Sequence, residues 1–245
     1  MAFPTQSADF EASSSQYLTR ADNALLEGGT AFTVEGWIKP ESYGSKLWSK
    51  RNVSPNRSYS IGLGGTSSSD SYIFAQLSSD GSSNAYDSSK LVPITLGTWY
   101  HIAFTFSGSG LANEIKYFLN GVQQGTTDAP GFASVFDNTS DFAIGCENPN
   151  GTPVDFYDGR MVLVRMWQVV RTEAEIAANM CTVLGTTASL SGEWTLDNTL
   201  NDNSGNSLTL TDHATVTFGA DVPAACAAAG DSGRDARFFT LRGVG

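Results

Sequence analysis

The chain has 245 residues, of which 16% are charged and 25 are glycine, and its formal net charge at pH 7 is −11. This length suits one large β domain or two small ones, and a core of that size holds together without a disulfide scaffold. An acidic surface repels phosphate groups, so the charge disfavours nucleic acid and anionic membranes as partners.

The start of the chain lacks the basic and then apolar order of a secretory signal peptide. No stretch of the sequence reaches the run of about 20 apolar residues that a membrane-spanning helix needs. We therefore expect a soluble protein without membrane insertion, which would reach a virion or an extracellular surface without a secretory signal.

Short segments in which apolar and polar side chains alternate recur along the chain, and this period of two is typical of strands with one buried face. In chain order, the predicted strands are residues 8–18, 32–40, 46–50, 59–63, 72–77, 91–94, 99–106, 115–119, 122–125, 142–145, 161–167, 193–196, 208–210 and 215–218. Asn120 and Gly121 form the strongest hairpin signal, and the Gly/Ser-rich residues 64–70 join a second predicted hairpin. We therefore predict an all-β jelly-roll β-sandwich of two antiparallel sheets.

One short helix is predicted after Arg171. Thr172 supplies an N-cap and Glu175 follows three residues later, which is the pattern of a capping box. We expect this helix to run to about Met180 and to pack Ile176 and Met180 on a sheet edge.

The cysteines are few and odd in number, namely Cys146, Cys181 and Cys226. A secreted disulfide scaffold would carry more cysteines in an even number, and their spacing does not indicate zinc. One pair could form a bridge, and Cys181 with Cys226 is the favoured pair. Three free, buried thiols are the alternative.

The end of the chain differs in composition from the rest. Residues 224–230 are rich in alanine, and residues 231–245 carry three arginines and two aspartates around Phe238 and Phe239. We therefore divide the chain into a sandwich domain, residues 1–223, and a C-terminal tail or arm, residues 224–245. The arm could dock on a partner such as a capsid; a disordered tail or a closing edge strand are the alternatives.

Seven segments in a fixed order carry a resemblance to a known family. They read FTVEGWIKP, LWSK, WYHIAFTF, YFLNGV, FAIGCENPN, GRMVLVRMW with TEAEI after it, and WTLDNTLNDNSGNSLTLT. In this order they resemble the laminin G-like group of the concanavalin A-like superfamily, close to its pentraxin branch, over roughly residues 7–218. The resemblance implies a concanavalin A-like jelly roll, a fold that hosts many functions.

For the pentraxin branch, the resemblance implies a calcium site in the loop after FAIG. Glu147 and Asn148 match the acidic and amide positions of the family, whereas Pro149 replaces an aspartate. The implied metal ligands are Glu147, Asn148, Asn150, Asp155 and Asp158. Calcium takes about six to eight oxygen ligands, and Glu147, Asp155 and Asp158 could supply three carboxylates. A polar loop whose Asn and Asp residues serve turns is the alternative.

Carbohydrate sites combine an aromatic platform with a few placed polar groups. Phe156 and Tyr157 are the preferred platform because they adjoin the predicted calcium loop, with Asn150 and Asp155 as polar contacts. Three other aromatic side chains are candidates for loops or outer faces: Trp48, Tyr72 and Tyr86. An aromatic anchor for its own loop is the alternative for Phe156 or Tyr157 alone.

The sequence lacks the alternating carboxylates that glycoside hydrolases of this superfamily place on one strand. Its two histidines, His101 and His213, are not accompanied by a nucleophile elbow or a triad. The resemblance gives His101 a structural character. We therefore predict that the protein is not an enzyme, and a glycoside hydrolase of the same fold is a disfavoured alternative.

These observations together predict a binding module that recognises a glycan or surface polysaccharide and acts in adhesion. We expect it to be displayed on a surface such as a virion, as a decoration or fibre protein, and to be a homo-oligomer or part of a larger assembly. The alternative is a purely structural capsid or surface display protein that binds no sugar.

Overall fold

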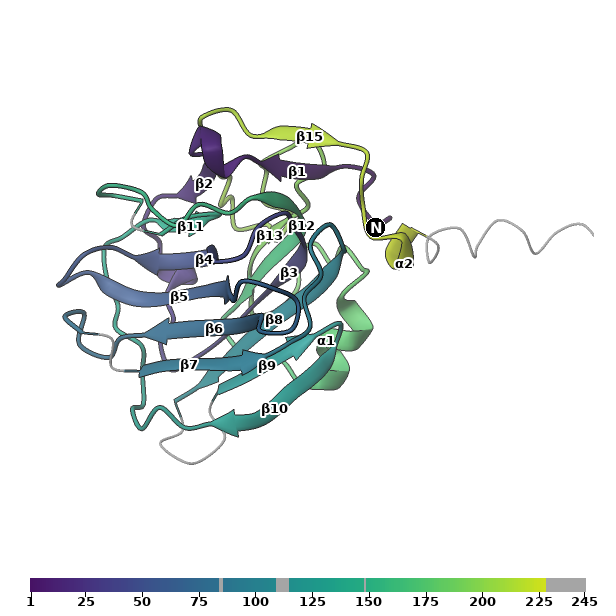
Figure 1. Cartoon of the computed structure of the whole chain (residues 1–245). Helices are drawn as coiled ribbons and strands as arrows, with labels where there is room; N and C mark the ends of the chain where they lie inside the picture. Colours follow the sequence, from purple (N-terminus) through teal and green to yellow (C-terminus); the bar gives the residue numbers. More distant parts are fainter. Residues whose placement is uncertain (84–85, 109–114, 148, 228–245) are drawn as a thin grey trace, which may run out of the picture.

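A computed structural model describes residues 1–83, 86–108, 115–147 and 149–227. Within them the strands form two antiparallel sheets packed face to face, as the jelly-roll prediction requires (Figure 1). The order in the eight-stranded sheet is β10 (Val122–Asp128), β9 (Ile115–Leu119), β8 (Tyr100–Ser107), β3 (Ala31–Pro40), β12 (Gly159–Trp167), β1 (Ser7–Phe10) and β15 (Thr217–Gly219), with β13 (Leu190–Trp194) also paired to β12. The order in the seven-stranded sheet is β14 (Thr211–His213), β2 (Tyr17–Arg20), β11 (Phe142–Ile144), β4 (Ser45–Arg51), β5 (Arg57–Gly64), β6 (Tyr72–Leu77) and β7 (Tyr86–Leu91).

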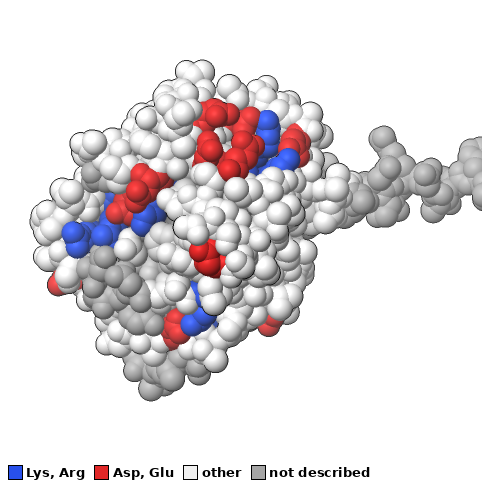
Figure 2. Space-filling view, in the orientation of Figure 1, with Lys and Arg blue, Asp and Glu red and all other residues white. Residues whose placement is uncertain are grey.

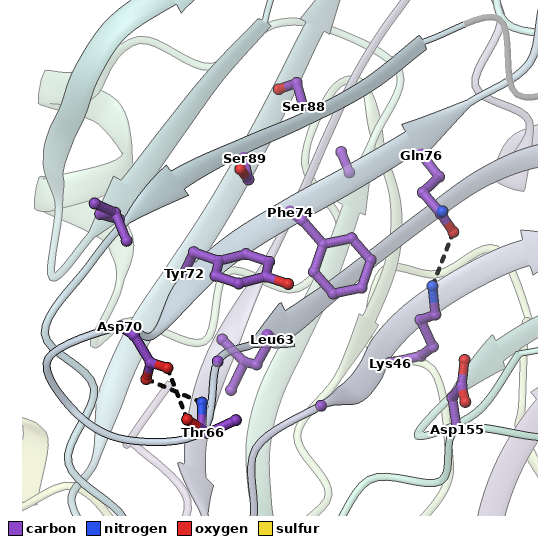
Figure 3. Close-up of a pocket in the computed structure, with 15 residues that line it drawn as sticks. Lys46, Leu63, Thr66, Asp70, Tyr72, Phe74, Gln76, Ser88, Ser89 and Asp155 are labelled. Carbon is purple, nitrogen blue, oxygen red and sulfur yellow. Dashed lines mark hydrogen bonds between the residues drawn. The ribbon is translucent and has the colours of Figure 1, made fainter.

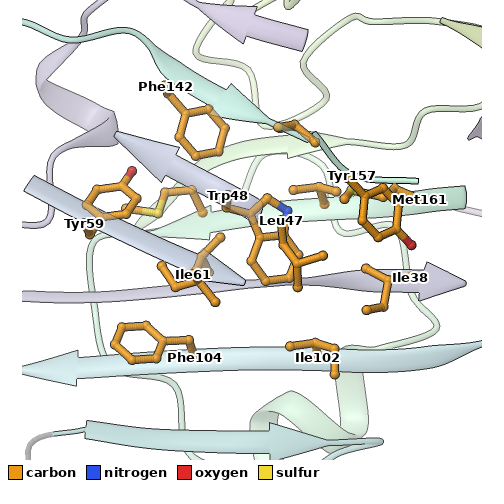
Figure 4. Close-up of a cluster of buried hydrophobic side chains, with 14 of the residues drawn as sticks. Ile38, Leu47, Trp48, Tyr59, Ile61, Ile102, Phe104, Phe142, Tyr157 and Met161 are labelled. Carbon is orange, nitrogen blue, oxygen red and sulfur yellow. The ribbon is translucent and has the colours of Figure 1, made fainter. Parts of the chain in front are cut away.

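The main core lies between the two sheets and is built by alternation along each strand. In β6, for example, Ile73, Ala75 and Leu77 are buried, whereas Tyr72 and the other alternate residues stay partly exposed. Large aromatic and aliphatic side chains from both sheets meet in this layer (Figure 4). Because the side chains on one face of β6 point into the core, those on its other face point to the outer surface of the sheet.

A second buried layer covers the outer face of the eight-stranded sheet. Helix α1 (Glu173–Asn179) packs Ile176 against Ala103 of β8 and Phe118 of β9. The predicted capping box of Thr172 and Glu175 is confirmed. The expected packing near a sheet edge is confirmed for Ile176, because β9 and β8 are the strands next to the edge strand β10, and the amide of Gln123 on β10 donates to Glu173 at 3.0 Å. Met180 packs farther into the sheet, beside Trp37 and Val162.

Beside this helix, a buried ionic network joins the sheet to the segment after α1. The Arg165 guanidinium lies 3.1 Å from Glu35 and 2.9 Å from Glu193, and it donates to the backbone carbonyls of Asn179 and Thr182. Buried charges require such partners because they have lost their hydration. The network thus fixes the covering segment on the sheet.

Several of the predicted strands differ from the structure. Residues 8–18 are not one strand but β1 and β2, which belong to different sheets and are joined by the 3-10 turn η1 (Ala12–Ser14) and by Ser15 at φ 56°. Residues 208–210 do not form a strand, and the predicted strand 215–218 begins later, at Thr217. Of the predicted strand 91–94 only Leu91 is in a strand, as the last residue of β7. The later start of β15 has a local cause, because Ala214 and Thr215 adopt positive φ and turn the chain there.

A disulfide joins Cys181 to Cys226 of helix α2 (Ala224–Ala227), which confirms the favoured pair, while Cys146 is a buried free thiol. A second helix, α2, was not predicted. The bridge ties the first residues of the predicted tail to the segment after α1, and residues 228–245, on which the rest of the predicted arm falls, lie outside the described residues. In the part of the chain that the structure describes, no helix has the length and apolar character needed to cross a membrane.

Two other short elements are η2 (Ala24–Leu26) and an isolated bridge between Glu147 and Val154. The bridge pairs Glu147 with Val154 through two backbone hydrogen bonds. Both residues belong to the loop from which the sequence predicted the metal and the sugar contacts.

Candidate functional site

The predicted site loop, residues 145–158, folds back over the outer face of the seven-stranded sheet. The hydroxyl of Ser49 on β4 donates to the carbonyl of Cys146 at 2.8 Å, and the Lys46 amide donates to the carbonyl of Asp155 at 3.0 Å. Tyr157 returns to the start of the loop by donating its amide to Gly145 at 2.8 Å. The loop therefore forms a wall on the sheet above β4.

Glu147 anchors this wall through both of its carboxylate oxygens. Its Oε2 lies 2.9 Å from Lys46 Nζ and accepts a hydrogen bond from Ser60, and its Oε1 lies 2.9 Å from Arg51 Nε. Burial alone would raise the pKa of Glu147, but the two cations outweigh it and hold this pKa below its usual range. Both oxygens already have cationic partners, so the Glu147 carboxylate does not fit a calcium ligand here.

The other predicted metal ligands are dispersed. The side chain of Asn150 accepts a hydrogen bond from the Asp141 amide at 2.7 Å, and that of Asp158 accepts one from the Ala12 amide at 3.1 Å. Asp155 is exposed to solvent, and its backbone has a positive φ of 54°. Asn148 lies outside the described residues. Among the residues that the structure describes, no three His, Cys, Asp or Glu side chains come together in a group that could hold a metal ion. Calcium binding stays a prediction.

The predicted aromatic platform is divided between the core and the surface. Tyr157 is fully buried, donates to the carbonyl of Arg160 at 3.1 Å and packs edge-on against Phe10. Phe156 is half-buried, with its ring centroid 6.0 Å from that of Tyr17. Trp48, another aromatic candidate, is fully buried in β4. Of these three rings, only Phe156 presents part of its surface outward.

A groove of about 940 Å³ lies next to the loop wall, on the outer face of β4 to β7 (Figure 3). Its lining includes two aromatic side chains of β6 and polar groups from the neighbouring strands and the wall: Lys46, Tyr72, Phe74, Gln76, Ser89 and Asp155. The rings of Tyr72 and Phe74 lie side by side, with centroids 6.0 Å apart and a tilt of 59°. Together with Leu63, Ala75 and the exposed Leu91, they form the apolar part of the groove lining.

Two glycines of β5 let these rings lie across the sheet. Gly62 pairs with Phe74 and Gly64 pairs with Tyr72. A Cβ added at Gly62 would lie 2.7 Å from the ring of Phe74, and one added at Gly64 would lie 2.1 Å from the ring of Tyr72. Any larger residue would push the rings away from β5, so these strand glycines shape the floor of the groove.

Polar contacts fix both ends of the groove. Lys46 Nζ donates to Gln76 at 2.9 Å and stands 4.5 Å above the centre of the Phe74 ring. At the other end, Asp70 accepts backbone and hydroxyl hydrogen bonds from Thr66 and Ser67, and these bonds lower the pKa of its carboxyl group. Asp70 thus holds the β5–β6 loop in shape.

The sequence did not predict this groove, and of its lining residues only Tyr72 and Asp155 were candidate binding residues. A signal was nevertheless present. In residues 72–77 (YIFAQL), two aromatic residues stand at alternate positions where a strand with one buried face normally has polar residues. In the preceding strand, residues 62–64 (GLG) carry two glycines with the same spacing of two. The β5–β6 register then brings these two patterns together.

This chain belongs to the concanavalin A-like lectin/glucanases superfamily, since a laminin G family model of that description matches residues 12–177. Among curated protein sequences, none matches. A candidate carbohydrate binding protein from Bacteroides ovatus has a similar structure, with 17% identity and a TM-score of 0.69, covering 89% of this chain and 60% of that protein. The heptameric SAP-like pentraxin of Limulus polyphemus is similar at 17% identity and a TM-score of 0.67, covering 92% of this chain and 99% of the pentraxin.

A third similar structure is the CBM40 domain of the Ruminococcus gnavus IT-sialidase bound to α2,3 sialyllactose. It is 17% identical with a TM-score of 0.54, and the match covers 71% of this chain and 97% of the domain. Tailspike protein 2 of bacteriophage CBA120 is 15% identical with a TM-score of 0.53, and the match covers 80% of this chain and 33% of the tailspike chain. At such low identities the similarity shows the shared fold.

Proposed function

We propose that the protein is a non-enzymatic glycan-binding module and that the groove over β4 to β7 is its binding site. The observation that carries the proposal is the pair of outward-facing rings, Tyr72 and Phe74, bordered by Lys46, Gln76 and Asp155. Aromatic rings can cover the apolar face of a sugar ring, while a few placed polar groups orient its hydroxyls. The similar structures of a candidate carbohydrate binding protein from Bacteroides ovatus and of CBM40 bound to α2,3 sialyllactose support carbohydrate as the class of ligand.

The carboxylates of the groove support binding without catalysis. Retaining and inverting glycosidases need two carboxyl groups that face the same bond. In the described lining of the groove, Asp70 is occupied by the hydrogen bonds of its own loop, which leaves Asp155 by itself. Elsewhere Glu35 and Glu193 both bind Arg165 and are at most 1% exposed, so a substrate cannot reach them.

Binding to a glycan array tests the proposal, with Phe74→Ala as the groove variant and Phe156→Ala as the matched control. Phe156 belongs to the loop that forms the wall, but its ring lies beside Tyr17 and is not part of the groove lining. We expect the chain to bind at least one glycan and Phe74→Ala to weaken that binding about tenfold or more, which corresponds to about 1.4 kcal/mol. A loss with Phe156→Ala and none with Phe74→Ala would contradict the groove and favour the site predicted from sequence.

A second candidate function is assembly into a surface layer or a virion. The heptameric pentraxin and the phage tailspike, whose structures share this fold, support it. Sedimentation velocity of the purified chain tests this candidate function, because a display protein should form a defined oligomer at micromolar concentration. A monomer over the whole accessible concentration range would contradict assembly by this chain alone.

A further inference from the structure

The charges of the groove indicate which glycans it can accept, and this step rests on the proposed function. The described lining carries one ammonium group and two carboxylates, on Lys46, Asp70 and Asp155. Figure 2 shows charged side chains on this face gathered into mixed acidic and basic clusters, with uncharged surface between them. The question is therefore which of the three groove charges remains available to a ligand.

The cation already has an anionic partner, the Glu147 carboxylate, which it shares with Arg51. The Lys46 side chain is only 7% exposed, and its ammonium group lies 2.9 Å from Glu147 Oε2 and 2.9 Å from Gln76 Oε1, above the Phe74 ring. An anionic ligand would have to compete with Glu147 for this ammonium group. In a partly buried site that competition is costly, because the carboxylate left behind loses a charged partner.

The two carboxylates differ in availability. Asp70 is occupied by Thr66 and Ser67, and Figure 3 shows its oxygens turned toward that loop. Asp155 is exposed at the rim, and within the described part of the chain no hydrogen bond or ion pair holds its carboxylate. The free charge that the lining offers a ligand is therefore negative.

We infer that the groove selects neutral, hydroxyl-rich glycans and rejects glycans that carry carboxylate or sulfate groups. Hydroxyls can donate to Asp155 and can accept from the amide of Gln76 or the hydroxyl of Ser89, so both roles of a sugar hydroxyl have partners. Acidic sugars meet like charge at Asp155 and a cation that Glu147 already holds. The selectivity therefore comes from repulsion of acidic sugars as well as from favourable contacts with neutral sugars.

Matched pairs of probes test this inference on the unaltered full chain. One pair is lactose and α2,3-sialyllactose, and the other is polygalacturonan and the galactan obtained by reducing its carboxyl groups. We expect the neutral member of a pair to bind about tenfold or more tightly than its acidic partner, and we expect added salt to change neutral binding little, because no charge pair forms. Comparable or tighter binding of the acidic members would overturn the inference.

A gain-of-function variant sharpens the test. Glu147→Gln removes the carboxylate that pairs with Lys46, so the ratio of acidic to neutral binding should rise several-fold. Glu175→Gln is the matched control, since it makes the same change on helix α1, which packs on the other sheet, and should leave the ratio unchanged. An unchanged ratio in a folded Glu147→Gln protein would contradict the role given to this carboxylate.

The outcomes separate this inference from the proposed function. If acidic probes bind and Phe74→Ala abolishes their binding, the groove is a glycan site but its selectivity for neutral glycans is refuted. If the chain binds no glycan of either class on the array, or if glycan binding is insensitive to Phe74→Ala, the proposed function itself fails and the inference fails with it.

Discussion

Gly64 controls the position of Tyr72 in the groove floor through the absence of a side chain. The residues pair across β5 and β6, and the ring of Tyr72 occupies the space that a Cβ at Gly64 would need. A strand glycine is normally a cost in conformational entropy. Here it allows an aromatic ring to lie across the neighbouring strand, which creates a flat contact surface.

Gly64→Ala should therefore weaken glycan binding by displacing the Tyr72 ring. We expect a loss similar to that of Tyr72→Ala, measured by titration with a glycan that the unaltered chain binds. The double variant Gly64→Ala/Tyr72→Ala should lose little more than Tyr72→Ala alone, because the two changes remove the same contact. Additive losses would show that Gly64 acts by another route.

His101 is a second residue whose surroundings set a measurable property. It is 1% exposed, with its Nε2 3.6 Å from Glu35, and burial lowers its pKa from 6.5 to about 4, an effect that Glu35 opposes and Arg165 supports. The folded protein therefore keeps His101 neutral at a pH where the unfolded chain would bind a proton. Consequently, the free energy of unfolding should fall as pH drops from 6.5 toward 4.

The size of this effect follows from the pKa shift. It amounts to at most about 3 kcal/mol, since each pKa unit is worth about 1.36 kcal/mol. Urea unfolding at several pH values should show a steeper loss for the unaltered chain than for His101→Gln over this window. Parallel pH profiles for the two proteins would refute the assignment to His101.

Among the elements, the strands and the helix were largely predictable because their signals are local. The alternation of residues 32–40 and the capping box at Thr172 depend on nearest neighbours in sequence, and both appear in the structure. The turn after Phe10 was missed because the chain there changes sheets, which the alternation of side chains does not record. The family resemblance assigned Glu147 to calcium, and its ion pairs were not foreseen because Lys46 and Arg51 lie on a strand far earlier in the sequence.

The groove was missed for the same reason on a larger scale. The aromatic residues of 72–77 and the glycines of 62–64 are each visible in the sequence, but only the register of β5 against β6 places Phe74 over Gly62. The wall is added by a loop from a distant part of the chain. A surface made by cross-strand pairs therefore becomes visible only when strand order and register are both known.

Helix α1 offers a test of an element that is separate from the groove. Thr172 Oγ accepts from the Glu175 amide at 3.3 Å, and the Glu175 carboxylate accepts from the Thr172 amide at 2.8 Å. Thr172→Ala should lower the free energy of unfolding by about 1 kcal/mol, because the helix loses its N-cap. Thr172→Ser keeps the cap and should behave like the unaltered chain in chemical denaturation. An equal loss in both variants would contradict the capping role.

For the whole molecule, the disulfide joins the C-terminal described segment to the covering layer. Cys181 and Cys226 are 45 residues apart, and closing a loop of this length stabilises a protein by up to about 4 kcal/mol in the chain-entropy model. Reduction should therefore lower the melting temperature of the unaltered chain. The double variant Cys181→Ser/Cys226→Ser should melt at that lower temperature with or without reductant, and a further shift on reduction would point to Cys146 instead.

The pairing of the first strand with the last has a consequence for how the protein is made. Ala8 of β1 lies opposite Met161 of β12 and Phe218 of β15, so β1 has no partner until most of the chain has left the ribosome. At ordinary rates of translation this wait lasts roughly ten to forty seconds. During that time an unpaired, partly apolar strand is exposed to chaperones and to aggregation. Nascent chains stalled before β12 should thus remain sensitive to protease, whereas resistance at that stage would show that the N-terminal strands find temporary partners.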